Sequence, residues 1–310
     1  MLARARMTVP LISICVPAFK AEKHLGETLE SIRGQTFADW EVIVTEDGSK
    51  DGAEAIVQAF GRSMVQKVTY HRHDPNRGLP ATRNHGISNA HGTWIALLDS
   101  DDLWTADHLE TLAARAAQND ADLIHAGSLL FESDTGKELE TRAPSKEEIS
   151  AFPLSLFLGR YVIQPSSVLL RKQLWQTVGG FNPDFRYVED REMWLRCARA
   201  GGRFAYTGKI TCRYRKHGAA LSRHSEPMAI ASAKVCEQYA DWERLPRALR
   251  RREIAEAWTA AGRLVLRQNP KAATGYFRRA LRYGSFTPRI WAYLSAAAAM
   301  SVIKPSSPSS

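Results

Sequence analysis

The sequence predicts an α/β protein in which helices flank a mostly parallel sheet, followed by a helical C-terminal region. Short apolar runs alternate with segments of helical periodicity through the first 100 residues, as in chains that build parallel sheets. After residue 226 the pattern becomes wholly helical and rich in Ala and Arg. The 310 residues, 44% of them hydrophobic and 24% charged, are enough to bury one large core with an appendage.

The expected elements follow from hydrophobic periodicity. The expected strands are residues 11–16, 40–45, 68–71, 94–98, 122–131 and 168–171, and the expected helices are 21–33, 53–60, 80–90 and 189–200. In the first helix, for example, Leu25, Leu29 and Ile32 recur at helical spacing. Ligands of parallel sheets bind beyond the carboxyl ends of the strands. The loops 17–19, 46–49 and 99–102 should therefore share one rim.

The net charge of +9 belongs to the C-terminal region. From residue 226 onward there are 14 Lys and Arg against 6 Asp and Glu, whereas the first 225 residues hold 28 against 27. We expect a first domain at 1–225, a basic helical region at 226–303 and a disordered Pro- and Ser-rich tail at 304–310. Two roles for the basic region stay open: amphipathic helices that meet anionic lipid, or helices packed on the first domain with solvated arginines.

Several classes of protein are disfavoured. The four cysteines are scattered without a CxxC pair, which argues against a disulfide framework and a zinc site and fits a reducing cytoplasm. No apolar run approaches the roughly 18 residues that span a bilayer, and Pro10 and Pro17 bracket a run that fits a first strand better than a signal peptide. The sequence lacks GxGxxG after the first strand, GxxxxGK[ST] and GxSxG. We expect a cytoplasmic protein, with peripheral contact at the membrane face as an option.

Three aspartates within four residues directly follow an expected strand. Asp99, Asp101 and Asp102 repel one another, and a fold would gather them for one hard divalent cation, Mn²⁺ or Mg²⁺, which prefers carboxylate oxygens. The alternative is that Asp102 or Thr105 caps a helix beginning near Ala106. An isolated motif of this kind favours the cap, so its neighbours along the chain decide.

Five segments, taken in order, carry a resemblance to a known family. They are Val16-Pro17-Ala18-Phe19 with Glu22 close behind; Glu46-Asp47-Gly48-Ser49-Lys50-Asp51; Asn76-Arg77-Gly78 with Ala81-Thr82-Arg83-Asn84-His85-Gly86; Leu98-Asp99-Ser100-Asp101-Asp102; and Gly179-Gly180-Phe181 with Glu189-Asp190, Tyr214-Arg215-Lys216-His217 and Ser222. Together they resemble the family 2 glycosyltransferases of the GT-A fold over roughly residues 9–225. Lys20 stands where the family often has Asn, and Glu46 stands where it often has Asp, which keeps the charge.

The resemblance implies a Rossmann-like GT-A sheet and an inverting transfer of a sugar. The donor would be a nucleotide diphosphate sugar, and we expect a UDP-sugar. The acceptor would be a hydroxyl of a saccharide or lipid-linked saccharide in polysaccharide or cell-envelope synthesis. No nucleic-acid partner is expected. The implied donor contacts are Pro17, Ala18, Phe19, Glu22, Glu46, Asp47, Asn76, Arg83, Asp99, Ser100 and Arg215.

Within this set Asp47, paired with Glu46, is expected to contact the base. Unaided by the resemblance, Asp47-Gly48 would be interpreted as a common turn dipeptide. The metal ligands are expected to be Asp101, assisted by Asp99 or Asp102, with His217 as a candidate third ligand.

The expected general base is Asp190, which would take the proton of the acceptor hydroxyl, and Glu189 would orient it or the donor sugar. The simpler alternative for this pair is that acidic residues favour the first turn of a helix.

Two other functions stay open at this point. A metal-dependent nucleotidyl- or phosphoryl-transfer enzyme would also use strand-end aspartates, normally with two metals and no base-contacting loop. A catalytically inactive nucleotide-sugar-binding module would keep the fold without the reaction. The intact Asp99, Asp101 and Asp190 argue against the inactive module.

Overall fold

The computed structural model describes residues 11–217, 225–284 and 288–303. It divides the chain into two compact units, Met1–Gly218 and Ala219–Ser310. The tail expected at 304–310 and Ser222 of the fifth segment lie outside the described residues.

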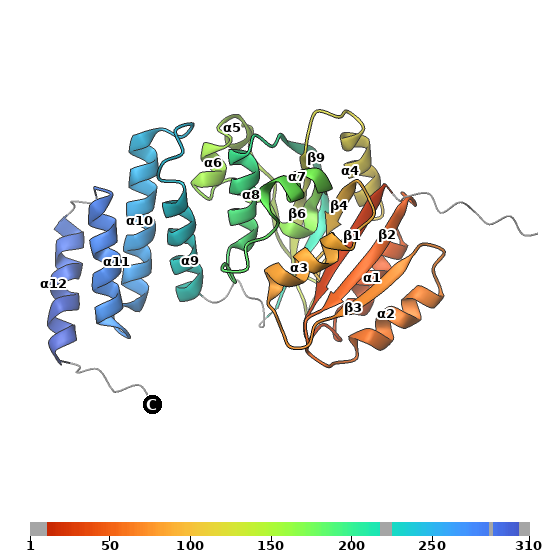
Figure 1. Ribbon diagram of the computed structural model, residues 1–310, viewed down its shortest axis with the longest axis horizontal. Helices are drawn as coiled ribbons and strands as arrows, with labels where there is room; N and C mark the ends of the chain where they lie inside the picture. Colours follow the sequence, from red (N-terminus) through yellow and green to blue (C-terminus); the bar gives the residue numbers. More distant parts are fainter. Residues whose placement is uncertain (1–10, 218–224, 285–287, 304–310) are drawn as a thin grey trace, which may run out of the picture. The chain divides into compact units, whose positions relative to one another are not determined.

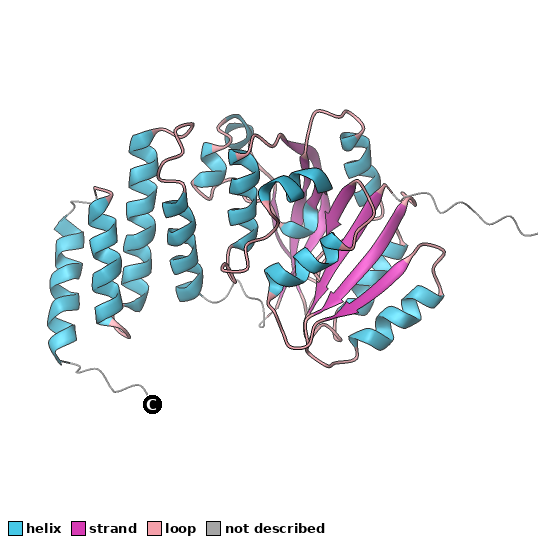
Figure 2. Cartoon of the chain, in the orientation of Figure 1, coloured by secondary structure: helices cyan, strands magenta, loops and turns pink. Residues whose placement is uncertain are grey.

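One sheet organises the first unit (Figures 1 and 2). Its described strands are β1 (Ile12–Ala18), β2 (Trp40–Glu46), β3 (Val68–Arg72), β4 (Trp94–Leu97), β5 (Leu103–Trp104), β6 (Leu123–Glu132), β7 (Glu138–Arg142), β8 (Val168–Arg171) and β9 (Phe204–Lys216). The spatial order is β3-β2-β1-β4-β8-β6-β9-β5, and β7 pairs with β6. Strands β3, β2, β1 and β4 are mutually parallel, as are β6 and β9, while β8 runs antiparallel between β4 and β6. The expected mostly parallel sheet is confirmed.

Helices lie on both faces of the sheet. The described helices of the first unit are α1 (Leu25–Arg33), α2 (Ala53–Arg62), α3 (Leu79–Ser88), α4 (His108–Ala116), α5 (Lys146–Ser150), α6 (Leu154–Phe157), α7 (Lys172–Val178) and α8 (Glu189–Arg199), together with the 3₁₀ turn η1 (Pro165–Ser167). Helix α3 crosses the near face of the sheet in Figure 2. There Gly86 of α3 lies against Cys15 of β1, because a Cβ on Gly86 would be 3.6 Å from the Cβ of Cys15.

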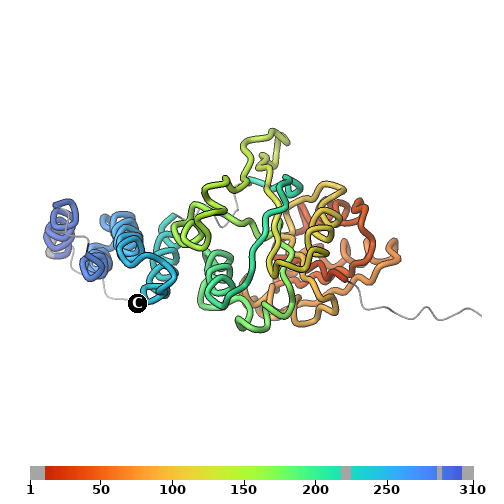
Figure 3. Tube along the Cα trace, turned by 90° about the horizontal axis from the view of Figure 1, so that it is seen from above, coloured from red at the N-terminus to blue at the C-terminus, as the bar shows by residue number. Residues whose placement is uncertain are grey.

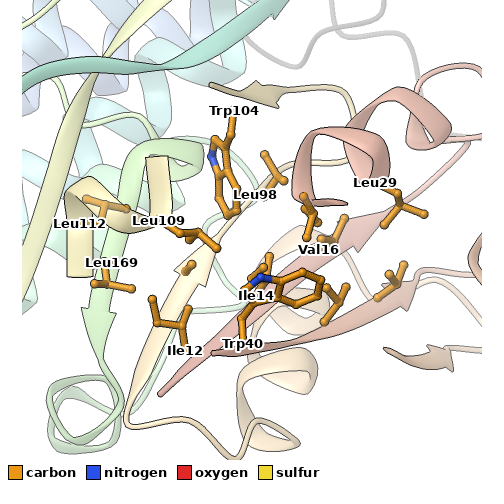
Figure 4. Packing of buried hydrophobic residues seen from close by; sticks show 14 of the residues in the cluster. Ile12, Ile14, Val16, Leu29, Trp40, Leu98, Trp104, Leu109, Leu112 and Leu169 are labelled. Carbon is orange, nitrogen blue, oxygen red and sulfur yellow. The ribbon is translucent and has the colours of Figure 1, made fainter. Parts of the chain in front are cut away.

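The main core lies on the opposite face. Alternate side chains of β1, namely Ile12, Ile14 and Val16, are buried with Leu29 of α1 and Leu98 beyond β4 (Figure 4). This is the period-two alternation of a strand. The buried hydrophobic residues of α2 and α4 join the same cluster. The core therefore holds β1 and β4 rigidly, and their carboxyl ends carry the rim expected to bind ligand.

Several boundaries and elements differ from the sequence prediction. Helix α1 begins at Leu25 rather than at residue 21, and α4 begins at His108 rather than near Ala106. Asp107 precedes α4, so Asp102 does not cap that helix. Strands β5, β7 and β9 and helices α5, α6 and α7 are not predicted from the sequence. Strand β9 was not predicted because many of its residues are charged and partly exposed, so that the alternation of apolar and polar residues typical of a strand is not visible.

The second unit consists of helices, as predicted from its composition. They are α9 (Ser225–Gln238), α10 (Arg247–Val265), α11 (Pro270–Arg282) and α12 (Pro288–Ile303), each packed on the next along the chain (Figures 1 and 3). Ile254, Trp258 and Phe277 are fully buried between them. In the described part of the chain no helix is both long and apolar enough to cross a bilayer.

Candidate active site

The loops after β1, β2 and β4 share one rim, because these three strands are adjacent and parallel. The backbone links the first two loops directly, since the amide of Asp47 donates to the carbonyl of Ala18 at 2.8 Å. The rim predicted from the strand order is therefore present.

The end of β1 presents one aromatic ring to solvent. Pro17 and Ala18 are buried, whereas Phe19 is 49% exposed. Lys20 follows with a left-handed φ of 51° and holds its ammonium group 5.5 Å from the Phe19 ring centroid. The Glu22 amide donates to the Asp51 carboxylate at 3.1 Å. Of these residues, Phe19 offers a planar surface on which a base can stack.

Glu46 at the end of β2 has one carboxylate oxygen that accepts hydrogen bonds from the protein and one that accepts none from the described residues. Its Oε1 accepts hydrogen bonds from the amide and the hydroxyl of Ser49, both at 2.5 Å. Its Oε2 lies 3.5 Å from Arg72 Nε but has no hydrogen-bond partner among the described residues. The side chain is almost completely buried. A buried oxygen without a donor is costly unless a ligand or water satisfies it, which makes Glu46 Oε2 a candidate acceptor for a ligand N–H.

Asp47 uses its carboxylate inside the protein. Its Oδ1 accepts from the Arg77 amide at 2.9 Å and lies 2.8 Å from His73 Nδ1, while its Oδ2 accepts from the Gly78 amide at 2.8 Å. Asn76 donates to the Asp47 carbonyl at 2.8 Å. Burial pushes the pKa of Asp47 up, but these hydrogen bonds outweigh it and the pKa lies below its ordinary value. Asp47 thus orders the loop between β3 and α3.

The three aspartates after β4 have three different environments. Asp99 Oδ1 accepts from Arg83 Nη2 at 2.7 Å, and Asp101 Oδ2 lies 2.7 Å from His217 Nε2. Asp102 is buried and accepts from the Ser166 hydroxyl at 2.6 Å and from the Arg215 amide at 2.8 Å. Ser100 contributes its carbonyl, which accepts from the Thr28 hydroxyl at 3.0 Å.

These environments separate the predicted metal ligands. Burial, followed by the nearby charges of Asp101 and Asp99, raises the pKa of Asp102 well above its usual range, and both its oxygens are occupied. Asp102 therefore does not fit a cation. Asp101 and His217 do fit, because their side chains are 34% and 20% exposed and carry oxygen and imidazole donors. No group of three Asp, Glu, His or Cys side chains in the described ranges is arranged to hold a metal.

The buried Arg215 side chain holds the backbone of the aspartate segment in place through hydrogen bonds. Its Nε donates to the Asp101 carbonyl at 2.6 Å and its Nη2 to Glu27 at 2.5 Å, with the guanidinium 4.8 Å from the Phe131 ring centroid. The side chain is only 4% exposed. Sequence reasoning missed Glu27, Thr28 and Ser166, since none of them belongs to a motif. They lie far from the aspartates along the chain, and only the fold brings them together.

Arg83 connects the aspartate segment to helix α8. Its Nη1 donates to Glu189 Oε1 at 2.6 Å, opposite the bond to Asp99. Asn84, the next residue, accepts from the Phe181 amide at 2.8 Å and donates to its carbonyl at 2.7 Å. Gly180 has a φ of 76°, and a Cβ there would lie 2.7 Å from Asn84 Oδ1, so this segment packs closely only as glycine.

The acidic pair Glu189 and Asp190 opens α8. Burial raises the pKa of Glu189 to about 7, against the opposing charge of Arg83 and with a further rise from Asp190. Asp190 is partly exposed and accepts from the Arg191 amide at 2.7 Å. Burial is also the main cause of a raised pKa at Asp190. A carboxylate that holds its proton more strongly than usual is the better acceptor of a proton from a hydroxyl.

A separate open pocket of about 420 Å³ lies on the outer side of α3. Its lining residues are His73, Arg77, Ala81, Asn84, His85, Ser88, Trp175, Gly179 and Pro183. None of the predicted donor, metal or base residues lines it. The converging charges on the rim therefore mark the candidate site better than this hollow does.

Comparisons with known proteins agree on one family. The family model described as Glycosyl transferase family 2 matches residues 13–177. The uncharacterized glycosyltransferase EpsJ of Bacillus subtilis is 28% identical over 220 residues, which cover 69% of this chain but only 63% of EpsJ. A PGL/p-HBAD biosynthesis glycosyltransferase of Mycobacterium tuberculosis is 28% identical over 193 residues, 62% of this chain and 71% of that protein.

Two solved structures share the fold. S. aureus TarS 1-349 in complex with UDP-GlcNAc superposes with a TM-score of 0.67 at 17% identity, covering 94% of this chain and 88% of TarS 1-349. The mannosyltransferase PcManGT from Pyrobaculum calidifontis, in complex with GDP-Man and Mn²⁺, gives a TM-score of 0.61 at 17% identity, covering 97% and 89%. At this level of identity the likeness establishes the architecture.

Proposed function

Since the chain belongs to glycosyl transferase family 2 and is a glycosyltransferase with the GT-A fold, we propose that it transfers a sugar with inversion from a UDP-sugar to a hydroxyl of a glycan or glycolipid. One observation carries the proposal: Arg83 joins Asp99, at the expected donor end, to Glu189, the neighbour of Asp190. This double ion pair brings the groups for the leaving diphosphate and for the nucleophile into one site.

The donor base is bound at the ends of β1 and β2. Phe19 stacks on the ring, and Glu46 Oε2 accepts the ring N–H, which satisfies an oxygen that otherwise has no donor. Asp47 and Asn76 do not contact the base themselves. They fix the loop between β3 and α3, which lies next to the base-binding residues. TarS with UDP-GlcNAc supports a uracil base, and PcManGT with GDP-Man supports nucleotide-sugar binding by this fold more generally.

Asp101 and His217 would hold a divalent cation, Mn²⁺ or Mg²⁺, because they offer a carboxylate oxygen and an imidazole nitrogen 2.7 Å apart. When bound, it supplies Lewis-acid stabilisation to the leaving diphosphate. The protein's own part is to keep Asp101 in place, which Arg215 does through the Asp101 carbonyl.

Asp190 is the general base. Its carboxylate takes the proton from the acceptor hydroxyl while that oxygen bonds to the anomeric carbon, and the bond from this carbon to the diphosphate oxygen breaks on the opposite face. An α-linked donor then gives a β-linked product. The raised pKa of Asp190 supports this role, because it strengthens the base near neutral pH.

A panel of nucleotide sugars tests the function. The full chain is incubated with UDP- and GDP-sugars, with and without Mn²⁺, and the phosphate product is identified. We expect one UDP-sugar to be turned over with release of UDP. Release of pyrophosphate or inorganic phosphate would indicate nucleotidyl or phosphoryl transfer instead, and binding without turnover of any donor or acceptor would indicate an inactive module.

The basic second unit acts as a peripheral contact with the cytoplasmic face of an anionic membrane. Arg244, Arg247 and Leu249 are all exposed around the start of α10, and exposed arginines near an exposed apolar side chain in the sequence suit an anionic lipid surface. The full chain should pellet with vesicles containing phosphatidylglycerol but not with pure phosphatidylcholine, and Arg244→Glu/Arg247→Glu should weaken pelleting several-fold. If the wild type and the double variant pelleted equally with vesicles of either composition, the proposed membrane contact would be contradicted.

A further inference from the structure

Arg83 is buried under the site and binds two carboxylates of the protein. Its side chain is 1% exposed, its Nη2 donates to Asp99 and its Nη1 to Glu189, while its Nε has no hydrogen-bond partner among the described residues. The Phe181 ring lies 5.4 Å from the guanidinium carbon. A buried guanidinium is stable only when its carboxylate partners stay in place, so the bridge fixes Glu189 as firmly as it fixes Arg83 itself.

The residue before Glu189 has an unfavourable backbone. Val188 precedes α8 with φ 53° and ψ 26°, the left-handed region. A β-branched side chain in this region costs on the order of 1–3 kcal/mol and persists only where the surroundings enforce it. The Val188 carbonyl accepts from the Glu192 amide at 3.0 Å, which ties the turn to the helix. On the other side of the turn, the ion pair between Arg83 and Glu189 at 2.6 Å is a second restraint.

We propose that Arg83 is a positioning residue for sugar transfer, and that it acts by holding Glu189 so that Val188 keeps its left-handed turn and Asp190 faces the acceptor. The inference rests on the proposed function, in which Asp190 is the base. Without the bridge, Val188 relaxes toward an extended conformation and the first turn of α8 reorients. Asp190 then loses its alignment although its own side chain is unchanged.

The role differs from the donor contact that the family resemblance implies for Arg83. A donor contact would raise the donor KM when lost. A positioning role lowers kcat, because it affects the alignment of the base rather than the affinity for the nucleotide. It also makes a second, specific claim: a residue that accepts the left-handed region without strain should replace the bridge in part. Asn is such a residue.

The experiment compares Arg83→Met, Val188→Asn and the double variant. Arg83→Met should lower kcat by about 30-fold or more with a donor KM within about threefold of the wild type. Val188→Asn alone should retain most activity and raise Tm by a few degrees, because it removes the strain. The double variant should recover about tenfold of the lost kcat. Arg83→Lys is the charge-conserving control and should rescue poorly, since an ammonium group cannot span two carboxylates in fixed directions.

A double variant no faster than Arg83→Met would overturn the proposal and leave Arg83 acting through its charge alone. A raised donor KM with unchanged kcat would likewise overturn it. If Arg83→Met does not fold, Glu189→Gln replaces it, because Gln keeps one acceptor for Arg83, and the same recovery by Val188→Asn is required. Hydrogen exchange at the Glu192 amide, which donates to the Val188 carbonyl, tests the turn without any activity: it should rise in Arg83→Met and fall back in the double variant. A wild type that transfers no sugar would refute the proposed function and leave this structural readout intact.

Discussion

Asp190→Asn should lower the rate of sugar transfer by about 10²–10⁴-fold. Asn occupies the same space and keeps an oxygen that can accept from the Arg191 amide, so the first turn of α8 survives. It cannot take a proton, so the acceptor hydroxyl must attack undeprotonated. Steady-state kinetics with saturating donor and acceptor measures the loss in kcat, and the donor KM should change little.

Asp184→Asn is the matched control for this change. Asp184 is an exposed aspartate a few residues earlier in the chain, and its loss should leave kcat near the wild-type value. A rate of Asp190→Asn close to that of the control would show that another group accepts the proton. Glu189, whose pKa is raised to about 7, would then be the group to test next.

Loss of the Asp101 carboxylate should reduce transfer by about 100-fold or more and shift the dependence on Mn²⁺ to higher concentration. In Asp101→Asn the amide is a weaker cation ligand, while the backbone carbonyl that binds Arg215 remains. The melting temperature should therefore stay near that of the wild type. Chelation with EDTA should give a loss of similar size, reversed by added Mn²⁺ or Mg²⁺.

Asp102→Asn provides the contrast within the same motif. Its carboxylate holds Ser166 and the Arg215 amide in the interior, so its replacement should lower Tm rather than alter the metal dependence. Full activity of the wild type in EDTA would contradict the assigned cation. An equal effect of both substitutions on the metal dependence would contradict the division between Asp101 and Asp102.

Much of the fold was predictable because its central strands are continuous apolar runs. Strands β1, β2 and β4 are buried along their whole length, and β8 matches its predicted bounds. The rim followed from their parallel order. Strand β9 was not predictable in the same way, since it lies partly exposed and its 13 residues carry several charges.

For the site, the sequence identified the residues but not their partners. The three aspartates within four residues cannot be told apart from the sequence, yet one pairs with Arg83, one lies against His217 and one is buried against Ser166. A motif specifies chemistry, and only long-range contacts decide which carboxylate oxygen is still free. The same holds for Glu46 and Asp47, where the spare oxygen belongs to Glu46.

The most direct test of the central claim, inverting transfer from a UDP-sugar with Asp190 as base, is the anomeric configuration of the product. Proton NMR of a reaction started with the α-linked donor found in the panel would follow the anomeric signal and its coupling to the neighbouring proton. A first-formed β-linked product, absent with Asp190→Asn, is the result expected here. A first-formed α-linked product would contradict the single displacement and the role of Asp190.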